Sequence, residues 1–264
     1  MRGKTIIWIL FGAFVLFLLF APHQNVKITD LAAAFSGFTP EHPFGTDNLG
    51  RDLFALMIEG GQRTLLVVLI ATSIAFVGGS LLGMVAAYRG GLAKTLIQFI
   101  ADFVTVVPSL VVALVFSALF GFSAVMAGIV FGIGNMGQYI NLSQELTLET
   151  KAHDYINAEM SLGLSGPAIL FKHILPNIAR RLFVYMGNNA SSVVLQYAGL
   201  AFIGLGVDTT NPDWGTLLYD YRVYMLTHPE LIIIPMAAIC ILALFFHFAF
   251  DDGKVKSEEL TIYD

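Results

Sequence analysis

Long apolar runs alternate with shorter polar segments along the chain. A helix that crosses a bilayer needs about 20 mostly apolar residues, and runs of about 17 still suffice. Six runs approach or exceed that length, at residues 5–21, 63–88, 95–120, 123–142, 182–202 and 231–250. The pattern predicts an all-α membrane protein with six transmembrane helices.

The polar segments between these runs define the expected organisation of the chain. We expect these parts in order: a first transmembrane helix at 1–22, an extracytoplasmic segment at 23–62, a transmembrane core at 63–250 with a cytoplasmic loop at 143–181 and an external loop at 203–230, and a polar tail at 251–264.

A cleaved signal peptide is the alternative for the first apolar run. That run is long for the apolar part of a signal peptide. Pro22 and His23 follow it directly, so a clear small-residue cleavage site is missing. A retained first helix is therefore favoured.

A polar island with a helical pattern occupies residues 151–177. Apolar or small residues recur there at steps of three and four, with one acid among them: Ala152, Tyr155, Ile156, Glu159, Met160 and Gly163. We expect Gly163 to end a first short helix, because glycine adopts the left-handed conformation at little cost. Ser165 is the expected cap of a second helix with Pro167 in its first turn, and Pro176 is expected to break the pattern again.

The distribution of basic residues orients the chain. With the N-terminus inside, cytoplasmic segments carry ten Lys and Arg residues and external segments carry four. This bias places both termini and the island in the cytoplasm. The external segments hold nine acids against their four bases, which suits a cationic ligand or a basic partner, although ordinary solvated loops are the favoured interpretation.

Composition agrees with a membrane class and excludes others. Of 264 residues, 56% are hydrophobic and 12% are charged, and the net charge of −5 gives no basic footprint for nucleic acid. Cys240 is the only cysteine, so neither an intramolecular disulfide nor a cysteine metal cluster is expected. The six histidines are too scattered in sequence to suggest a metal site.

The sequence offers no energy source or catalytic motif of its own. It lacks the phosphate-binding G-x-x-x-x-G-K-[ST] pattern and the hydrolase patterns H-E-x-x-H and G-x-S-x-G. Apart from histidine, and from Arg63 at the edge of the second run, Asp102 is the acidic or basic side chain found inside a predicted span. It is either a helix-end carboxylate near water or a buried anchor. Ion-driven transport usually needs such groups, so it is disfavoured. A solute pathway of this kind implies a partner that supplies energy.

The island resembles the cytoplasmic loop of ABC-importer permeases, in which E-A-A is followed by G and by an I/L-L-P ending. Asn157, Ala158 and Glu159 stand at the E-A-A positions, Gly163 stands at the expected spacing, and the residues H-I-L-P-N at 173–177 match the ending of the peptide/nickel branch.

Other blocks carry the same resemblance. Residues 42–52, HPFGTDNLGRD, are similar to a signature of that branch before its second span. Residues 201–207, AFIGLGV, and 211–215, NPDWG, are similar to its segment before the last span. Asp102 and Pro108 fall where the branch carries an Asp…Pro pair.

The resemblance implies a type I ABC-importer permease fold in a bacterial inner membrane, with a coupling helix in the cytoplasmic loop. It implies four kinds of partner: a second homologous permease, two ABC ATPase subunits, an extracytoplasmic substrate-binding protein and the bilayer. ATP and Mg²⁺ would be bound by the ATPases, so this chain would carry no catalytic residue and no cofactor. The substrate class would be di- or oligopeptides, nickel or metal chelates, with a lean toward metals or chelates.

The resemblance also assigns site residues. ATPase coupling would involve Tyr155, Asn157, Ala158, Glu159, Leu162, Gly163 and Leu164, with apolar contacts from Tyr155, Ala158, Leu162 and Leu164. Asn157 stands where the family has glutamate, and Glu159 where it has a small residue. The coupling contact then uses either a neutral hydrogen bond or a shift in register onto Glu159, and we expect a narrowed partner preference.

On the external side, two loops are candidates. Asp213, Trp214 and Arg222 are either contacts for the binding protein or loop packing. The structural interpretation is favoured for the block before the second span. The structural set comprises Gly45, Asp47, Gly50, Arg51, Asp52, Asp102, Pro108 and Pro176. An ion-coupled secondary transporter and a scaffold that recruits a cytoplasmic enzyme remain as alternatives.

Overall fold

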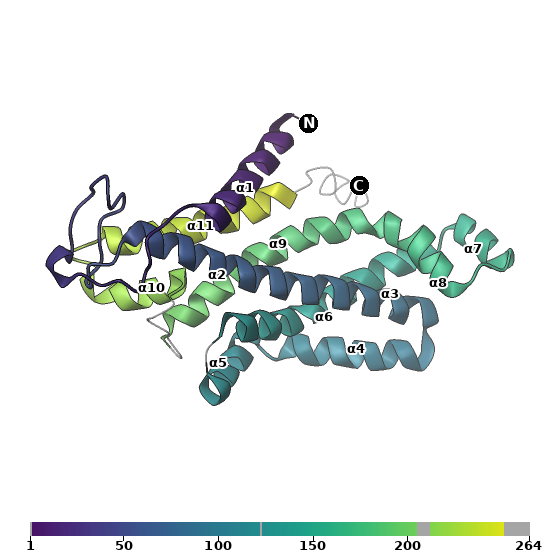
Figure 1. Cartoon of the computed structure of the whole chain (residues 1–264). Helices are drawn as coiled ribbons and strands as arrows, with labels where there is room; N and C mark the ends of the chain where they lie inside the picture. The colour runs from purple at the N-terminus through teal and green to yellow at the C-terminus, as the bar shows by residue number, and fades with distance from the viewer. Residues whose placement is uncertain (1, 122, 205–211, 251–264) are drawn as a thin grey trace. The chain divides into compact units, whose positions relative to one another are not determined.

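A computed structural model describes residues 2–121, 123–204 and 212–250 (Figure 1). The expected tail at 251–264 and residues 205–211 of the expected external loop lie outside these ranges. Within them the secondary structure is helical, and the only extended pairing recorded is an isolated antiparallel bridge between Thr46 and Asp52. The all-α prediction is therefore confirmed for the part of the chain that the structure describes.

The chain forms two compact units. The first contains Met1–Leu69, Ala113–Gly128 and Ser191–Ala249. Its helical elements, some of which continue into the second unit, are α1 (Arg2–Phe20), η1 (Leu31–Ala33), α2 (Leu53–Ser73), α5 (Ser109–Phe120), α9 (Leu175–Phe202), α10 (Trp214–Tyr221), η4 (Arg222–Tyr224) and α11 (Glu230–Phe250).

Aromatic side chains join the first and last helices of this unit. The ring of Phe11 on α1 lies 5.0 Å from that of Phe246 on α11, and Phe14 lies 5.3 Å from Phe245. Such pairs add to the stability that their buried area provides. The first apolar run is thus tied to the last.

The second unit contains Ile70–Val112 and Ile129–Ala190 among its described residues. Its elements are the π-helical segment η2 (Ile74–Gly79), α3 (Ser80–Arg89), α4 (Gly91–Val106), α6 (Ala124–Lys151), α7 (Asp154–Ser161), α8 (Gly166–Ile169), the π-helical segment η3 (Leu170–Ile174) and the first half of α9.

Close backbone contacts hold the helices of the second unit together. A Cβ at Gly83 of α3 would lie 2.3 Å from the Ile140 carbonyl oxygen of α6, and one at Gly137 would lie 2.5 Å from the Ala101 carbonyl oxygen of α4. Small residues permit this approach, which favours helix association in a bilayer. Here α6 packs against both α3 and α4.

Helix limits differ from the predicted apolar spans in two places. The second helix begins at Leu53, ten residues before the predicted 63, because the Asp52 carboxylate accepts from the Ala55 amide at 2.9 Å and caps it. The third predicted span is broken between α4 and α5 with a bend of 76°, at Val107 and Pro108. A proline lacks the amide that a continuous helix would need.

Pro176 does not break the helix as expected. It lies in the first turn of α9, which follows α8 and η3 without interruption. A proline ring clashes with the carbonyl four residues earlier in a regular helix. That carbonyl belongs to Lys172, inside the wider π-helical turn of η3, so the local change of pitch accommodates Pro176.

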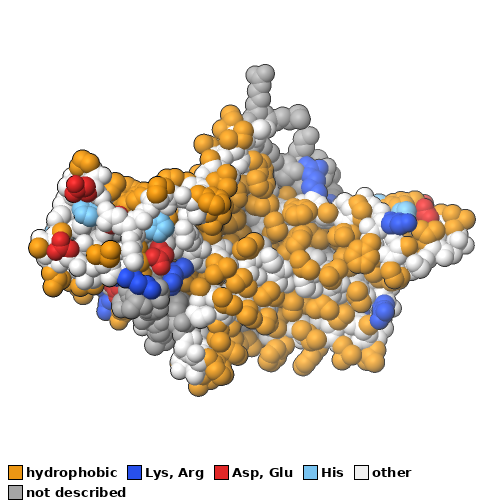
Figure 2. Space-filling model, viewed as in Figure 1, with side chains coloured by type: hydrophobic (Ala, Val, Ile, Leu, Met, Phe, Trp, Pro, Cys, Tyr) orange, Lys and Arg blue, Asp and Glu red, His pale blue; other side chains and the backbone are white. Residues whose placement is uncertain are grey.

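Within the described residues, two helices are long and apolar enough to cross a membrane. They are Leu53–Arg89 and Glu230–Phe250, and the bent pair of α4 and α5 makes a third if it counts as one span. Helices α6 and α9 have 28 residues each, but amide and hydroxyl side chains interrupt them. Figure 2 shows hydrophobic side chains over most of the visible face, with charged groups and histidines gathered over the segment before α2 and over α7.

Candidate functional site

The polar island of the sequence folds into α7, a tight turn and α8. Asp154 lies in the first turn of α7, where a negative charge interacts favourably with the helix dipole. After the C-cap Leu162, Gly163 adopts φ +88°. The Gly163 amide donates to the Met160 carbonyl at 3.1 Å, and the Leu164 amide donates to the Glu159 carbonyl at 3.2 Å. These two bonds define a Schellman motif.

The second short helix begins as expected but without its expected cap bond. Ser165 precedes α8 in the N-cap position, yet its side chain makes no capping hydrogen bond. Pro167 lies in the first turn. Gly166 packs under the Tyr88 ring at the end of α3, where a Cβ would lie 2.7 Å from Cε1. Contact with Tyr88 therefore fixes the start of α8.

A buried hydrophobic cluster anchors the island to the rest of its unit. Ile156 of α7, Ile169 of α8 and Ile174 of η3 are each 0% exposed. They pack with further side chains from α3, α6, η3 and α9: Met84, Leu146, Leu170, Ile178 and Leu182. Full burial of one such side chain contributes about 1.5–3 kcal/mol. The island is therefore a packed element with a fixed inner side.

The predicted coupling residues divide between the inner and outer sides of α7. Asn157, Ala158, Leu162 and Gly163 are exposed, and Leu162 retains 78% of its accessible surface. Tyr155 is also exposed, and Glu159 and Leu164 are half-buried. Leu164 packs against the hydrophobic cluster. The outer side thus presents small, apolar and amide groups.

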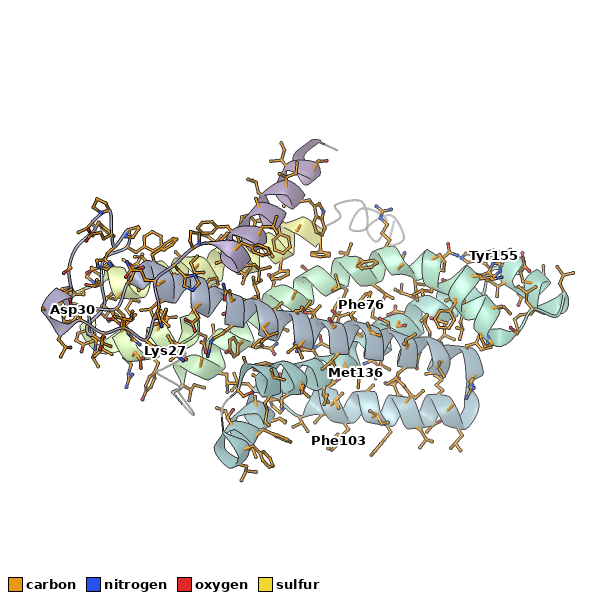
Figure 3. All side chains as sticks on the ribbon, viewed as in Figure 1. Lys27, Asp30, Phe76, Phe103, Met136 and Tyr155 are labelled. Atoms are coloured by element: carbon orange, nitrogen blue, oxygen red, sulfur yellow. The ribbon has the colours of Figure 1, made fainter. Side chains whose placement is uncertain are left out.

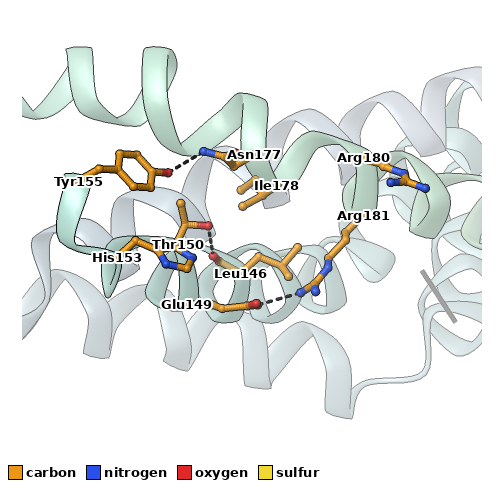
Figure 4. A pocket seen from close by; sticks show the side chains of 9 residues that line it. All are labelled: Leu146, Glu149, Thr150, His153, Tyr155, Asn177, Ile178, Arg180 and Arg181. Carbon is orange, nitrogen blue, oxygen red and sulfur yellow. Dashed lines mark hydrogen bonds and ion pairs between the residues drawn. The ribbon is translucent and has the colours of Figure 1, made fainter. Parts of the chain in front are cut away.

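A pocket of about 330 Å³ lies beside α7, between the end of α6 and the start of α9 (Figure 4). Arg181 Nη1 donates to Glu149 Oε2 at 2.8 Å, and Asn177 Nδ2 donates to Tyr155 Oη at 2.8 Å. The His153 and Tyr155 rings stack with centroids 5.9 Å apart. Sequence reasoning missed the Glu149–Arg181 and Tyr155–Asn177 pairs, because 32 and 22 residues separate their members.

In the first unit, the block at 42–52 folds around a buried carboxylate. Asp47 is 0% exposed and its Oδ1 accepts from the amides of Leu49 and Arg51 at 2.8 and 2.9 Å. Its Oδ2 accepts from Arg51 Nε at 2.7 Å and from the Tyr221 hydroxyl of α10 at 2.9 Å. Gly50 has φ +70°, and a Cβ there would collide with the Asp30 carbonyl oxygen. Asp47 thus joins the segment before α2 to α10.

Burial and the charge of Asp47 both shift the pKa values of Tyr221 and Arg51. Burial raises the pKa of the Tyr221 hydroxyl well above its ordinary value, and the Asp47 charge adds to the rise. Burial lowers the pKa of Arg51, but Tyr221 and Asp47 outweigh this and the net direction is upward. The phenol therefore stays protonated and donates to Asp47, while Arg51 stays charged.

Trp214 is buried against α2. It is 1% exposed, its indole nitrogen donates to the Met57 carbonyl at 2.8 Å, and its ring lies over Gly60 and Gly61 of α2. A buried indole offers no surface to an external partner.

Asp213 is also buried and caps α10. Its Oδ1 accepts from the amides of Gly215 and Thr216 at 2.9 and 3.0 Å, and its Oδ2 accepts from the Tyr197 hydroxyl at 3.0 Å. Burial raises the pKa of this carboxyl, and the hydrogen bonds from Thr216, Tyr197 and Gly215 oppose the rise. Arg222, by contrast, is exposed with its guanidinium 3.7 Å from the Tyr219 ring centroid.

Asp102 and Pro108 occupy different surroundings in the second unit. Asp102 is exposed on α4 and accepts from Gln98 Nε2 at 2.8 Å, and Pro108 stands at the break before α5. Across the described ranges, no group of three or more His, Cys, Asp or Glu side chains is arranged to hold a metal ion. The long apolar helices define the class of an integral membrane protein.

Comparison with known proteins identifies the family. Residues 79–254 match the inner membrane component of binding-protein-dependent transport systems. A dipeptide transport system permease protein of Alkalihalophilus pseudofirmus is 30% identical over 94% of this chain and 85% of its own length. A probable D,D-dipeptide transport system permease protein of Escherichia coli is 31% identical over 96% and 89%. A metal-staphylopine import system permease protein of Staphylococcus aureus is 29% identical over 87% and 82%.

The chain belongs to this family, and the resemblance to the peptide/nickel branch of ABC-importer permeases is confirmed. It is an inner-membrane permease subunit of an ATP-driven importer and is not an enzyme, since ATP hydrolysis in this family belongs to partner subunits. The comparisons give no support to a secondary transporter or a scaffold.

Proposed function

We propose that this permease forms half of the solute pathway and that its cytoplasmic loop, 143–181, transmits the movement of ATPase subunits. The single observation that carries the proposal is the arrangement of α7. Its inner side is fixed by the fully buried Ile156, and its outer side exposes Asn157, Ala158 and Leu162. A short helix that is rigid on one side and exposed on the other transfers force without bending.

The partners follow from the family and from the absence of a phosphate-binding motif in the sequence. A second homologous permease completes the pathway, two ABC ATPases bind ATP and Mg²⁺, and an extracytoplasmic binding protein delivers the solute. Closure of the ATPases would turn the permeases between inward- and outward-facing states as rigid bodies. This chain needs no cofactor for that role.

We further propose six spans with both termini in the cytoplasm. The bias of ten basic residues against four supports this orientation. Helices α6 and α9, at 28 residues, are long enough to span because a helix rises about 1.5 Å per residue. Their polar side chains would face protein or water. The first helix, α1, would span through its apolar part, Thr5–Phe20.

The solute is a peptide or a metal chelate. Relatives named for dipeptides and for metal-staphylopine support this class. The lean toward metals rests on the sequence pattern alone. On the external surface, Arg222 is the predicted receptor contact that retains an accessible charge. Asp213 and Trp214 would act indirectly, by holding the loop that carries Arg222.

Charge placed on the outer side of α7 tests the coupling role. In the assembled transporter, Leu162→Glu and Gly163→Asp are expected to abolish solute-stimulated ATPase activity and to reduce co-purification of the ATPases. Leu31→Glu is the matched control, because Leu31 is also a highly exposed apolar residue, at 72%, but lies in the segment before α2, to which no partner contact is assigned. Full stimulated activity in both loop variants would refute the docking assignment.

A further inference from the structure

A chain of polar side chains joins α4 to α6 in a region that is otherwise apolar. Gln98 Nε2 donates to Asp102 Oδ1 at 2.8 Å and to Asn141 Oδ1 at 3.0 Å. Gln144 Nε2 donates to Gln98 Oε1 at 3.3 Å. Because Asp102 and Asn141 are both exposed in the isolated chain, this cluster opens onto a surface of the second unit.

The side of α4 that suits contact with lipid is a different one from the side that carries this polar cluster. Leu96, Phe99 and Phe103 are 56%, 70% and 62% exposed and lie on the side of α4 opposite the buried Ala101. Figure 3 shows Phe103 projecting outward from α4. Asp102 lies between that apolar side and the contact with α6. One side of α4 thus carries an apolar row, Leu96, Phe99 and Phe103. The polar row, Gln98, Asp102, Asn141 and Gln144, lies where α4 meets α6.

A carboxylate inside a span is costly in hydrocarbon and typically faces protein or a water-filled pathway. Asp102 lies twelve residues into a helix of sixteen, Gly91–Val106, so it lies well away from the start of α4. The side-chain amide of Gln98 donates to both Asp102 Oδ1 and Asn141 Oδ1. This donor is neutral, so these two bonds do not bring a positive charge to the Asp102 carboxylate. Among the charges on α4 and α6 near this row, Glu145 follows Asn141 by one turn and Lys94 precedes Asp102 by two.

We propose that Asp102, held by Gln98 beside Asn141, lines the solute pathway and receives a positively charged group of the solute as it passes. This rests on the permease function proposed above and adds the recognition chemistry that the pathway uses. The cationic group is the ammonium of a peptide or the positive charge of a metal complex. The amides fix the carboxylate and offer it a hydrated surface.

Accessibility of an introduced cysteine tests this in the complete transporter. Cys240 is exposed, so Cys240→Ser provides the background. Asn141→Cys places a thiol on the polar row, and Gln138→Cys places one at the exposed position one turn earlier on α6. Each thiol is treated with a cationic trimethylammonium-ethyl and an anionic sulfonato-ethyl methanethiosulfonate. We expect both reagents to react, with the cation favoured by about fivefold relative to a free thiol because of a nearby carboxylate.

Two comparisons decide the result. Adding Asp102→Asn is expected to remove the charge preference, whereas Phe103→Cys on the apolar side is expected to remain unreactive. Unreactive thiols at both polar positions, or a preference that persists with Asp102→Asn, overturn the proposal. A third outcome separates this proposal from the ATPase-coupling proposal. If only the coupling proposal is wrong, the thiols still prefer the cationic reagent, but their modification rates do not change when ATP and vanadate lock the ATPases.

Protection identifies the source of the cation. With the binding protein present, protection of Asn141→Cys by millimolar glycylglycine but not by N-acetylglycylglycine assigns an ammonium group. Protection by Ni²⁺ alone that is lost with Asp102→Asn assigns a metal cation, whereas protection that persists with Asp102→Asn reports Ni²⁺ bound to the thiol itself and overturns the proposal. If neither probe slows modification, Asp102 does not receive the solute and the proposal is overturned.

Discussion

Replacing Asp47 by asparagine removes the charge at the centre of the external fold while changing its shape little. The carboxylate is fully buried and accepts four hydrogen bonds, two from backbone amides and two from Arg51 Nε and the Tyr221 hydroxyl. An amide in its place turns one acceptor into a donor, and Arg51, 5% exposed, loses its bonded counter-charge. Loss of one partner of a buried ion pair costs about 3–5 kcal/mol.

Tyr221→Phe sets the lower reference. It deletes one of the four bonds and leaves the ion pair with Arg51 intact, so its expected cost is about 1.5–3 kcal/mol, the range for a hydrogen bond to a charged group. Asp30→Asn is the matched control: Asp30 is exposed, its Oδ1 accepts from the Ala32 amide, and asparagine preserves that cap. That change is expected to stay within about 0.5 kcal/mol.

The chain's own fluorescence provides the assay. It contains two tryptophans, Trp8 and Trp214, and Trp8→Phe leaves Trp214 as the reporter of the external fold. Urea unfolding in detergent micelles then gives the free energy of unfolding of each variant. The expected order of destabilisation is Asp47→Asn, Tyr221→Phe, then Asp30→Asn. If Asp47→Asn costs no more than Tyr221→Phe, the buried pair does not hold this region together.

Three further changes probe other contacts. Gly60→Ala forces a Cβ to within 2.9 Å of Trp214 Cδ1, and the same fluorescence assay should show destabilisation of about 1–3 kcal/mol. Gly163→Ala meets no atom within 4 Å but must adopt φ +88°, so binding of the ATPases should weaken by about 1–2 kcal/mol in a titration, with Gly163→Asn closer to wild type. Glu149→Gln, which breaks the exposed pair with Arg181, should change stability to urea by less than about 1 kcal/mol.

Local sequence predicted those features that local interactions determine. The apolar runs indicated membrane helices, and the spacing between Ile156 and Gly163 indicated a short helix followed by a glycine turn, as α7 and its C-cap now display. Pro176 was expected to break the helix because sequence alone does not reveal a π-helical turn that makes room for a proline. The sequence pattern therefore predicted the positions of helices better than the positions at which helices are interrupted.

Contacts between distant residues were beyond such reasoning. The hydroxyl of Tyr221 and the carboxylate of Asp47 are 174 residues apart, and Trp214 and the Met57 carbonyl are 157 apart. The sequence left Trp214 open between a contact for the binding protein and loop packing, because an isolated aromatic carries no local sign of what covers it. The tertiary structure covers it with α2, through Gly60 and Gly61.

The departure at Asn157 and Glu159 admits two explanations for coupling, and the geometry of α7 favours one of them. Residues two apart on a helix point to different sides. Glu159 is half-buried and lies three positions from Ile156, on the side of α7 that enters the hydrophobic cluster, whereas Asn157 is exposed. Presenting Glu159 outward would rotate α7 and withdraw Ile156, at a cost of roughly 1.5–3 kcal/mol for re-exposing one such side chain.

A neutral hydrogen bond from Asn157 is therefore the coupling contact that we predict. Asn157→Ala should lower solute-stimulated ATPase activity severalfold, because a neutral hydrogen bond contributes about 0.5–1.5 kcal/mol, and Glu159→Gln should leave it near wild type. Asn157→Glu should weaken coupling to the chain's own ATPases, since it adds a charge that they are not matched to receive. A loss of coupling in Glu159→Gln but not in Asn157→Ala would reverse the assignment and require α7 to rotate on docking.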